Sequence, residues 1–125
     1  MKTVSFISRR RIMTQGLEAA IAARPLLGLK ILPMIPPQNV CTDIQVYGPD
    51  LIMIDVTADM QQETLFALCR QLRGSLAGSR LFLLIAEDNV YYRNLSVRAK
   101  QSGLADDFVF YDNSMDYLLA KLSAL

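Results

Sequence analysis

Asp55 is the carboxylate best placed to do chemistry in this chain. It ends the run Leu-Ile-Met-Ile-Asp at residues 51–55, directly after a Pro-Asp pair. An apolar run this short between turn residues predicts a strand that is buried on both faces. In open α/β sheets, ligands and chemistry collect at the edge formed by the carboxyl ends of the strands. We therefore expect Asp55 at that edge.

Three arginines, Arg9, Arg10 and Arg11, follow the first predicted strand and should reach the same edge. Arg9 or Arg10 can pair with Asp55, because a guanidinium binds a carboxylate through two parallel hydrogen bonds. The run can instead bind a small anionic ligand such as a nucleotide or phosphate, although no glycine-rich phosphate loop lies beside it. A solvated run of charge is the third interpretation. The sequence leaves all three open.

Metal or acid–base chemistry elsewhere has less support. The carboxylate pairs Glu87-Asp88 and Asp106-Asp107 fall at loop and helix-start positions, where solubilising charges and helix caps are the simpler interpretation. The chain contains no histidine, which is the commonest general base and metal ligand. Cys41 and Cys69 fit no metal or redox spacing and are expected to be reduced packing residues. We therefore expect no enzymatic activity, no metal and no other cofactor.

The composition indicates a single globular domain, residues 1–125. Of the 125 residues, 52% are hydrophobic and 20% are charged, which is enough apolar material to bury a core. No apolar run approaches the roughly 18 residues of a membrane span, and early arginines interrupt any signal peptide, so we expect a cytoplasmic protein without membrane contact. Residues 1–30 carry a balance of +5 and the remainder −4. This near-neutral total argues against direct nucleic-acid binding.

The elements that must position these residues alternate between strand and helix patterns. Strands are predicted at residues 3–8, 29–32, 51–55, 81–86 and 107–111. Helices are predicted at residues 13–23 and 40–47, from a cap at Asp59 to a stop at Gly74, at residues 91–103, and after a cap at Ser114. Because strands that alternate with helices require parallel pairing, we predict an α/β fold with a three-layer, doubly wound, five-stranded parallel sheet.

Several segments resemble the receiver domains of two-component response regulators. Residues 49–55 (PDLIMID) are similar to the third strand of that family, whose closing aspartate accepts a phosphoryl group. Residues 83–88 (LLIAED) resemble its fourth strand and following loop, residues 105–109 (ADDFV) the approach to its fifth strand, and Ser114 onward its last helix. The resemblance covers essentially the whole chain. It implies a CheY-like, flavodoxin-type (βα)5 sheet with strand order 2-1-3-4-5 and a phosphoacceptor-like role for Asp55.

The chain departs from the family at the positions that support phosphorylation. Ser8 and Arg9 stand where receivers place the acidic pair that holds magnesium, and an arginine cannot replace an oxygen ligand. Ile85 replaces the hydroxyl residue that binds the phosphoryl group, and Tyr111 replaces the lysine that pairs with it. The segment after Asp55 is about two residues longer than usual. The resemblance implies that Phe108 keeps the aromatic switch position.

These departures predict a pseudo-receiver, a regulatory module that is not controlled by phosphorylation. The alternatives are a working phosphoacceptor at Asp55 and a domain that binds a small anion through residues 9–11. The resemblance implies a partner or homodimer surface on the fourth helix, fifth strand and fifth helix, where exposed tyrosines among Tyr91, Tyr92 and Tyr117 would suit an interface. It extends to the receiver-like front halves of LuxR-type transcription regulators, in which a helix-turn-helix output domain follows.

Overall fold

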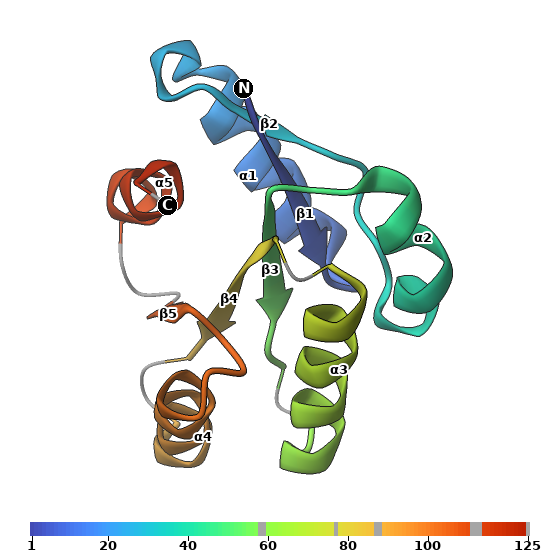
Figure 1. Ribbon diagram of the computed structural model, residues 1–125. Helices are drawn as coiled ribbons and strands as arrows, with labels where there is room; N and C mark the ends of the chain where they lie inside the picture. Colours follow the sequence, from blue (N-terminus) through green and yellow to red (C-terminus); the bar gives the residue numbers. More distant parts are fainter. Residues whose placement is uncertain (58–59, 77, 87–88, 111–113, 125) are drawn as a thin grey trace.

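Five parallel strands form one sheet in the order β2-β1-β3-β4-β5, and five α-helices cover its two faces (Figure 1). The computed structural model describes residues 1–57, 60–76, 78–86, 89–110 and 114–124. The strands are β1 (Lys2–Ile7), β2 (Leu29–Ile31), β3 (Leu51–Asp55), β4 (Arg80–Ile85) and β5 (Asp107–Phe110). The helices are α1 (Arg11–Ala22), α2 (Val40–Tyr47), α3 (Gln62–Ser75), α4 (Val90–Gln101) and α5 (Met115–Ser123), with short 3₁₀ turns at Pro25–Leu27 and Pro37–Asn39. The predicted fold class and strand order are confirmed.

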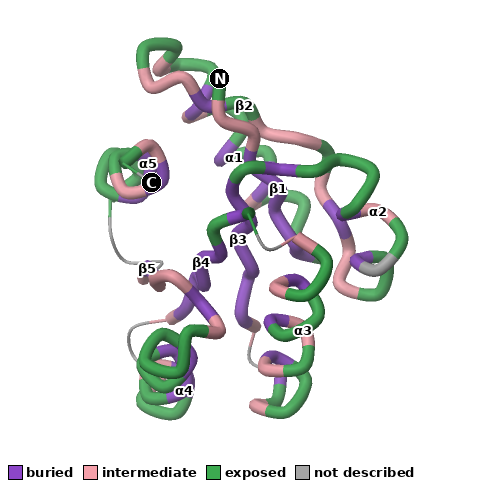
Figure 2. Tube along the Cα trace, in the orientation of Figure 1, coloured by how far each residue is buried: buried purple, intermediate pink, exposed green. Residues whose placement is uncertain are grey.

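Two hydrophobic cores lie on opposite faces of the sheet and make the molecule three-layered. Helices α1 and α5 pack on one face, and α2, α3 and α4 pack on the other. Strand β3 contributes to both cores. Leu51 and Met53 face helices α1 and α5, while Ile52 and Ile54 face helices α2, α3 and α4. Figure 2 shows this central strand buried along its length. An apolar strand without alternating polarity is what burial on both faces requires.

The strand order reverses between β1 and β3, and this reversal positions the candidate site. Strand β1 pairs with β2 on one side and with β3 on the other. In the second pairing Ile7 lies opposite Ile54, so the residues that follow them, Ser8 and Asp55, emerge side by side at the carboxyl edge. Such a switch point is where α/β sheets open a crevice for ligands.

The helix boundaries agree with the predicted ones to within a few residues. Of the two predicted N-caps, one is confirmed and one is wrong. Ser114 caps α5 as predicted, its hydroxyl accepting a hydrogen bond from the Tyr117 amide at 3.1 Å. Helix α3 begins at Gln62 with Gln61 at the N-cap position, so the predicted cap at Asp59 is wrong in position; Asp59 itself lies outside the described residues. The helix also continues through Gly74 to Ser75, because a glycine within a helix costs stability without ending it.

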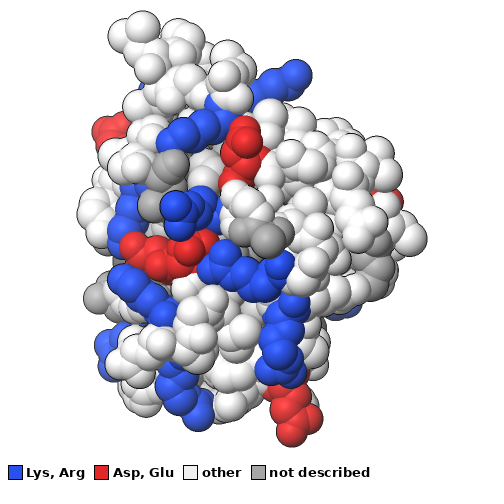
Figure 3. Space-filling model, in the orientation of Figure 1, with Lys and Arg blue, Asp and Glu red and all other residues white. Residues whose placement is uncertain are grey.

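The expectation that Asp106 and Asp107 are solubilising charges or helix caps is wrong, because both form ion pairs with other elements. Instead of solvating the surface, Asp106 accepts a hydrogen bond from the Leu81 amide at 2.7 Å and forms an ion pair with Arg73 at 2.9 Å. Asp107 forms ion pairs with Lys100 at 3.2 Å and Lys121 at 2.9 Å. Figure 3 shows basic and acidic side chains side by side on this face of the molecule. The pair therefore connects α3, α4 and α5 to the start of β5.

Cys69 lies in the core beneath α3, as the sequence predicts, and burial raises the pKa of its thiol to about 11. The side chain of Cys41 and the pair Glu87-Asp88 lie outside the described parts of the chain. Within the described parts, every helix is too short or too polar to cross a membrane.

Candidate functional site

Asp55 and Ser8 form the buried centre of the site. Asp55 is 2% exposed and Ser8 is 1% exposed, and the Ser8 hydroxyl donates a hydrogen bond to Asp55 Oδ2 at 2.7 Å. The Ser8 amide donates to the carbonyl of Ile35 at 3.1 Å, which fixes the end of β1 against the loop after β2. A buried carboxylate must be paired and hydrogen-bonded to be stable. Ser8 supplies part of that requirement.

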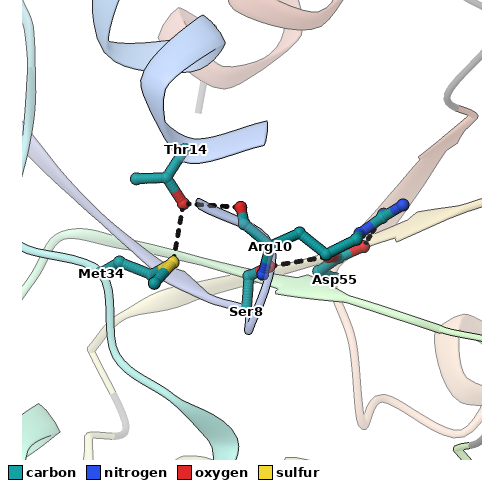
Figure 4. A network of polar contacts seen from close by, with 5 residues as sticks. All are labelled: Ser8, Arg10, Thr14, Met34 and Asp55. Carbon is teal, nitrogen blue, oxygen red and sulfur yellow. Dashed lines mark hydrogen bonds and ion pairs between the residues drawn. The ribbon is translucent and has the colours of Figure 1, made fainter. Parts of the chain in front are cut away.

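Arg10 supplies the counter-charge and the remaining hydrogen bonds of the Asp55 carboxylate. Its Nε donates to Asp55 Oδ2 at 2.7 Å, and its Nη2 forms a second hydrogen bond and ion pair with Asp55 Oδ1 (Figure 4). Its backbone amide donates to the Ser8 hydroxyl oxygen at 2.9 Å, which closes a three-residue network. The hydrogen bond with Asp55 raises the pKa of Arg10 further above its ordinary value, with a smaller charge contribution from the same carboxylate, although burial alone would lower it. Asp55 therefore faces a permanent counter-charge.

The backbone at the start of α1 directs Arg10 toward Asp55. Arg10 is the N-cap residue, and its extended conformation (φ −98°, ψ 97°) precedes the first helical turn. The Thr14 hydroxyl lies 3.4 Å from the Arg10 carbonyl oxygen and 2.9 Å from the sulfur of Met34, so it can donate to either (Figure 4). Thr14 is buried. It links the first turn of α1 and the loop after β2 to the arginine.

The sequence did not reveal this link. A threonine four residues after a carbonyl is a common back-bonding arrangement in helices, and that spacing between Thr14 and Arg10 was the available signal. The contact between Thr14 and Met34 depends on the path of a proline-containing loop. Local sequence does not predict how close that loop comes to α1.

Other residues singled out in the sequence occupy separate places around the site. Arg9 is exposed and lines a pocket beside Asp55, whereas Arg10 makes the pair. Ile85 is fully buried at the end of β4. Phe108 is half-buried and packs edge-to-face on Phe110, with ring centroids 5.7 Å apart. Tyr111 lies outside the described residues.

The pocket beside Asp55 has a volume of about 340 Å³. It is lined by Ser8, Arg9, Pro37, Asp55, Thr57, Met60 and Thr64. These residues come from the loops after β1, β2 and β3 and from the first turn of α3. Hydroxyl groups, one guanidinium and two apolar side chains thus converge on a cavity at the reversal of strand order.

The described residues around Asp55 do not fit a magnesium ion. Both carboxylate oxygens of Asp55 already accept hydrogen bonds from Arg10, and one accepts a third from Ser8. Magnesium requires oxygen ligands in a nearly octahedral arrangement, and here an arginine occupies the position beside the carboxylate. Among the described residues, no three acidic, cysteine or histidine side chains cluster closely enough to hold a metal.

Comparison with known proteins gives structural matches and no sequence matches. No protein-family model and no curated protein sequence matches the chain. Among solved structures, the chain is similar to a response regulator from Thermotoga maritima, with a TM-score of 0.77, 22% identity and coverage of 99% of this chain and 96% of that one. It is also similar to a LuxR-family DNA-binding response regulator from Staphylococcus aureus, with a TM-score of 0.75, 14% identity and coverage of 99% and 98%.

A CheY-like protein, TadZ, from Pseudomonas aeruginosa matches with a TM-score of 0.72, 12% identity and coverage of 99% and 98%. At these identities the matches establish the fold. The chain has the CheY-like fold of response regulator receiver domains.

Proposed function

We propose that this protein is a non-enzymatic regulatory module, a pseudo-receiver whose state does not depend on phosphorylation. The observation that supports this most strongly is the bidentate pairing of Arg10 with Asp55, reinforced by Ser8. The receiver fold of its structural neighbours supports a role in signalling. The module acts through contacts with a protein partner or with a second copy of itself.

The argument against phosphorylation comes from the needs of phosphoryl transfer. Catalysis of this step depends on positioning the nucleophile and on neutralising charge around the transferred group. The Asp55 oxygens that would attack are engaged by Arg10 and Ser8. The nearby Ile85 offers no hydroxyl, and the part of the site that the structure describes does not fit a metal. Asp55 thus keeps the position of a phosphoacceptor without the supporting groups.

Titration with magnesium and beryllofluoride, a mimic of a phosphorylated aspartate, tests the proposal. We expect amide NMR signals of the wild-type protein to stay unchanged, because Arg10 occupies the carboxylate. Asp55→Asn is the matched control, since it removes the acceptor while keeping the shape of the side chain. Shifts that centre on Asp55, extend to Phe108 and vanish in Asp55→Asn would instead establish the phosphoacceptor alternative.

A partner surface on α4 and α5 is the second part of the proposal. Tyr91 and Val97 on α4 and Met115 and Tyr117 on α5 are exposed, while Tyr92 is buried in the core. Tyrosine and methionine are enriched at protein interfaces. Similarity to a LuxR-family DNA-binding response regulator supports a regulatory partner for this surface.

A further inference from the structure

Leu26 is a fully exposed leucine, with 101% of its reference surface in contact with solvent. It lies in the 3₁₀ turn Pro25–Leu27 between α1 and β2, which begins with a proline and ends at Gly28 with φ +67°. Proline fixes its φ angle, and glycine adopts this left-handed angle without steric cost, so the two residues define the path of the turn. Figure 1 shows the turn beside the N-terminus, at the end of the molecule away from α3 and α4, and Figure 2 shows exposed chain there.

An apolar pocket lies beside this turn. Its volume is about 290 Å³, just below the usual range of small-molecule pockets, about 300–1,000 Å³. It is lined by Met1, Glu18, Ile21, Ala22, Pro25, Leu29, Lys30 and Ile31. A single exposed leucine is ordinary on a protein surface. A leucine on a defined turn next to an apolar pocket is a matched pair, because the pocket suits one aliphatic side chain.

The two charged residues of the pocket are complementary to each other. Glu18 comes from α1 and Lys30 from β2, and both are exposed. Within the described parts of the chain, neither side chain has an ion pair or a hydrogen bond. In a dimer with a two-fold axis, a residue that contacts another across the interface does so twice, once in each direction. Glu18 of each copy can therefore lie against Lys30 of the other.

The edge of the sheet at β2 indicates how two copies would meet. Strand β2 lies at the end of the strand order, pairs with β1, and has three residues, of which the central Lys30 is exposed. A short edge strand with an exposed lysine disfavours pairing between the edges of two sheets. Contact between copies at this surface therefore depends on side chains, with Leu26 as the knob and the pocket as the hole.

We infer that this surface, which consists of Leu26 and the pocket lining and is called the α1–β2 surface below, is the interface of a homodimer. Leu26 of each copy occupies the pocket of the other, and two Glu18–Lys30 pairs flank the contact. The inference goes beyond the proposed function, which does not require a dimer, and leaves the exposed residues of α4 and α5 to a different protein. So small an interface gives a weak, rapidly exchanging dimer.

Sedimentation velocity over a concentration series tests the inference. We expect a reversible dimer with a Kd on the order of 100 μM. Leu26→Ala should raise the Kd at least about tenfold, because the dimer loses two buried leucine side chains. The matched control is Val46→Ala, which should leave the Kd unchanged. Val46 is an aliphatic residue that is 80% exposed on α2, and α2 packs on the other face of the sheet.

Exchange of the two charges tests the arrangement of the interface. Glu18→Lys and Lys30→Glu should each weaken the dimer several-fold at low salt, because like charges then face each other twice. An equimolar mixture of the two variants should recover the wild-type affinity, since each variant supplies the charge that the other lacks. Recovery on mixing cannot come from a change in the fold of either variant.

Three results would overturn the inference: a monomer at every concentration, an unchanged Kd in a folded Leu26→Ala protein, or a mixture of the charge variants that is as weak as each alone. The same series in Val97→Glu combined with Tyr117→Glu separates the two surfaces. A dimer through the α1–β2 surface survives that double change, and complete loss of self-association there would also overturn the inference. All of these results leave the proposed function standing, because the titration with beryllofluoride tests it independently.

Discussion

At the scale of single residues, the stability of Asp55 depends on which group lies beside its carboxylate. A buried carboxylate is costly without a counter-charge. A metal supplies that charge only when it is bound, whereas Arg10 supplies it from the same chain and through two hydrogen bonds. The stability of the site therefore depends on the arginine itself.

Arg10→Ala should lower the free energy of unfolding by about 1–3 kcal/mol, because it leaves the buried Asp55 carboxylate with Ser8 alone. The side chain of Arg10 is 43% exposed, so water can reach the vacated space and reduces the loss below that of a fully buried pair. Urea unfolding monitored by circular dichroism measures the difference.

Arg11→Ala, at an exposed position, is the comparison and should change the unfolding free energy by less than about 0.5 kcal/mol. Adding Asp55→Asn to Arg10→Ala should recover part of the loss, since an amide needs no counter-charge. An Arg10→Ala protein with the wild-type urea midpoint would refute this account of the pair.

At the scale of elements, the start of β5 is held by ion pairs whose strength depends on pH. Burial alone would raise the pKa of Asp107, but hydrogen bonds from Lys121, the Phe108 amide and Lys100 outweigh it and hold the pKa below its usual value. Because the folded pKa lies below the unfolded one, near 3.9, the stabilisation is complete above about pH 4 and is lost as pH falls through the folded value.

We expect the wild-type melting temperature to fall more steeply below pH 4 than that of Asp107→Asn, which lacks the carboxyl group and its stabilisation. At pH 7 the variant should be the less stable protein, and the two curves should converge in acid. The control for general charge effects is Asp116→Asn. Asp116 lies on α5, is exposed, and forms an ion pair with Arg24. Parallel melting curves for wild type and Asp107→Asn would contradict the assignment.

The elements also show what sequence can and cannot predict. Strand β3 was predictable because its apolar run is short, lies between turn residues and ends in Asp55. Helix α2 matches the predicted residues 40–47, where Gly48 ends it at φ +50°, in the left-handed region. The start of α3 was mispredicted because an acidic residue three positions before a glutamine matches a cap pattern in the sequence, whereas Gln61 stands at the N-cap position of this helix.

The sequence was enough to predict which residues gather at the site, but not which arginine pairs with Asp55. The spacing placed arginines and Asp55 at one edge of the sheet. Choosing Arg10 over Arg9 required the dihedral angles of the turn between β1 and α1, because adjacent side chains in an extended backbone point in different directions. The ion pairs of Asp106 and Asp107 likewise join elements distant in sequence, and no local pattern encodes them.

At the scale of the whole molecule, the pocket beside Asp55 and the proposed partner surface are distinct regions. The pocket lies where β1, β2 and β3 end. Helix α4 is separated from α2 by α3 on one face of the sheet, and α5 covers the opposite face (Figure 1).

Val97→Glu combined with Tyr117→Glu should abolish self-association or partner binding through this surface, because it buries two charges in an interface. Sedimentation velocity over a concentration series measures self-association. Val46→Glu is the control, since Val46 is 80% exposed on α2. Helix α3 separates α2 from α4, and α5 lies on the opposite face (Figure 1). A dimer that survives the double change and dissociates in Val46→Glu would place the interface on α2.

The Arg10–Asp55 pair also changes where a cell can control this protein. A phosphorylated aspartate has a lifetime, set by the enzymes that add and remove the group, whereas an arginine of the same chain is present for as long as the chain is. Under the proposed function no phosphorylation step stands between the folding of a copy and its readiness to act. The amount of the protein, set by transcription, translation and proteolysis, then becomes a step at which a cell can adjust its output.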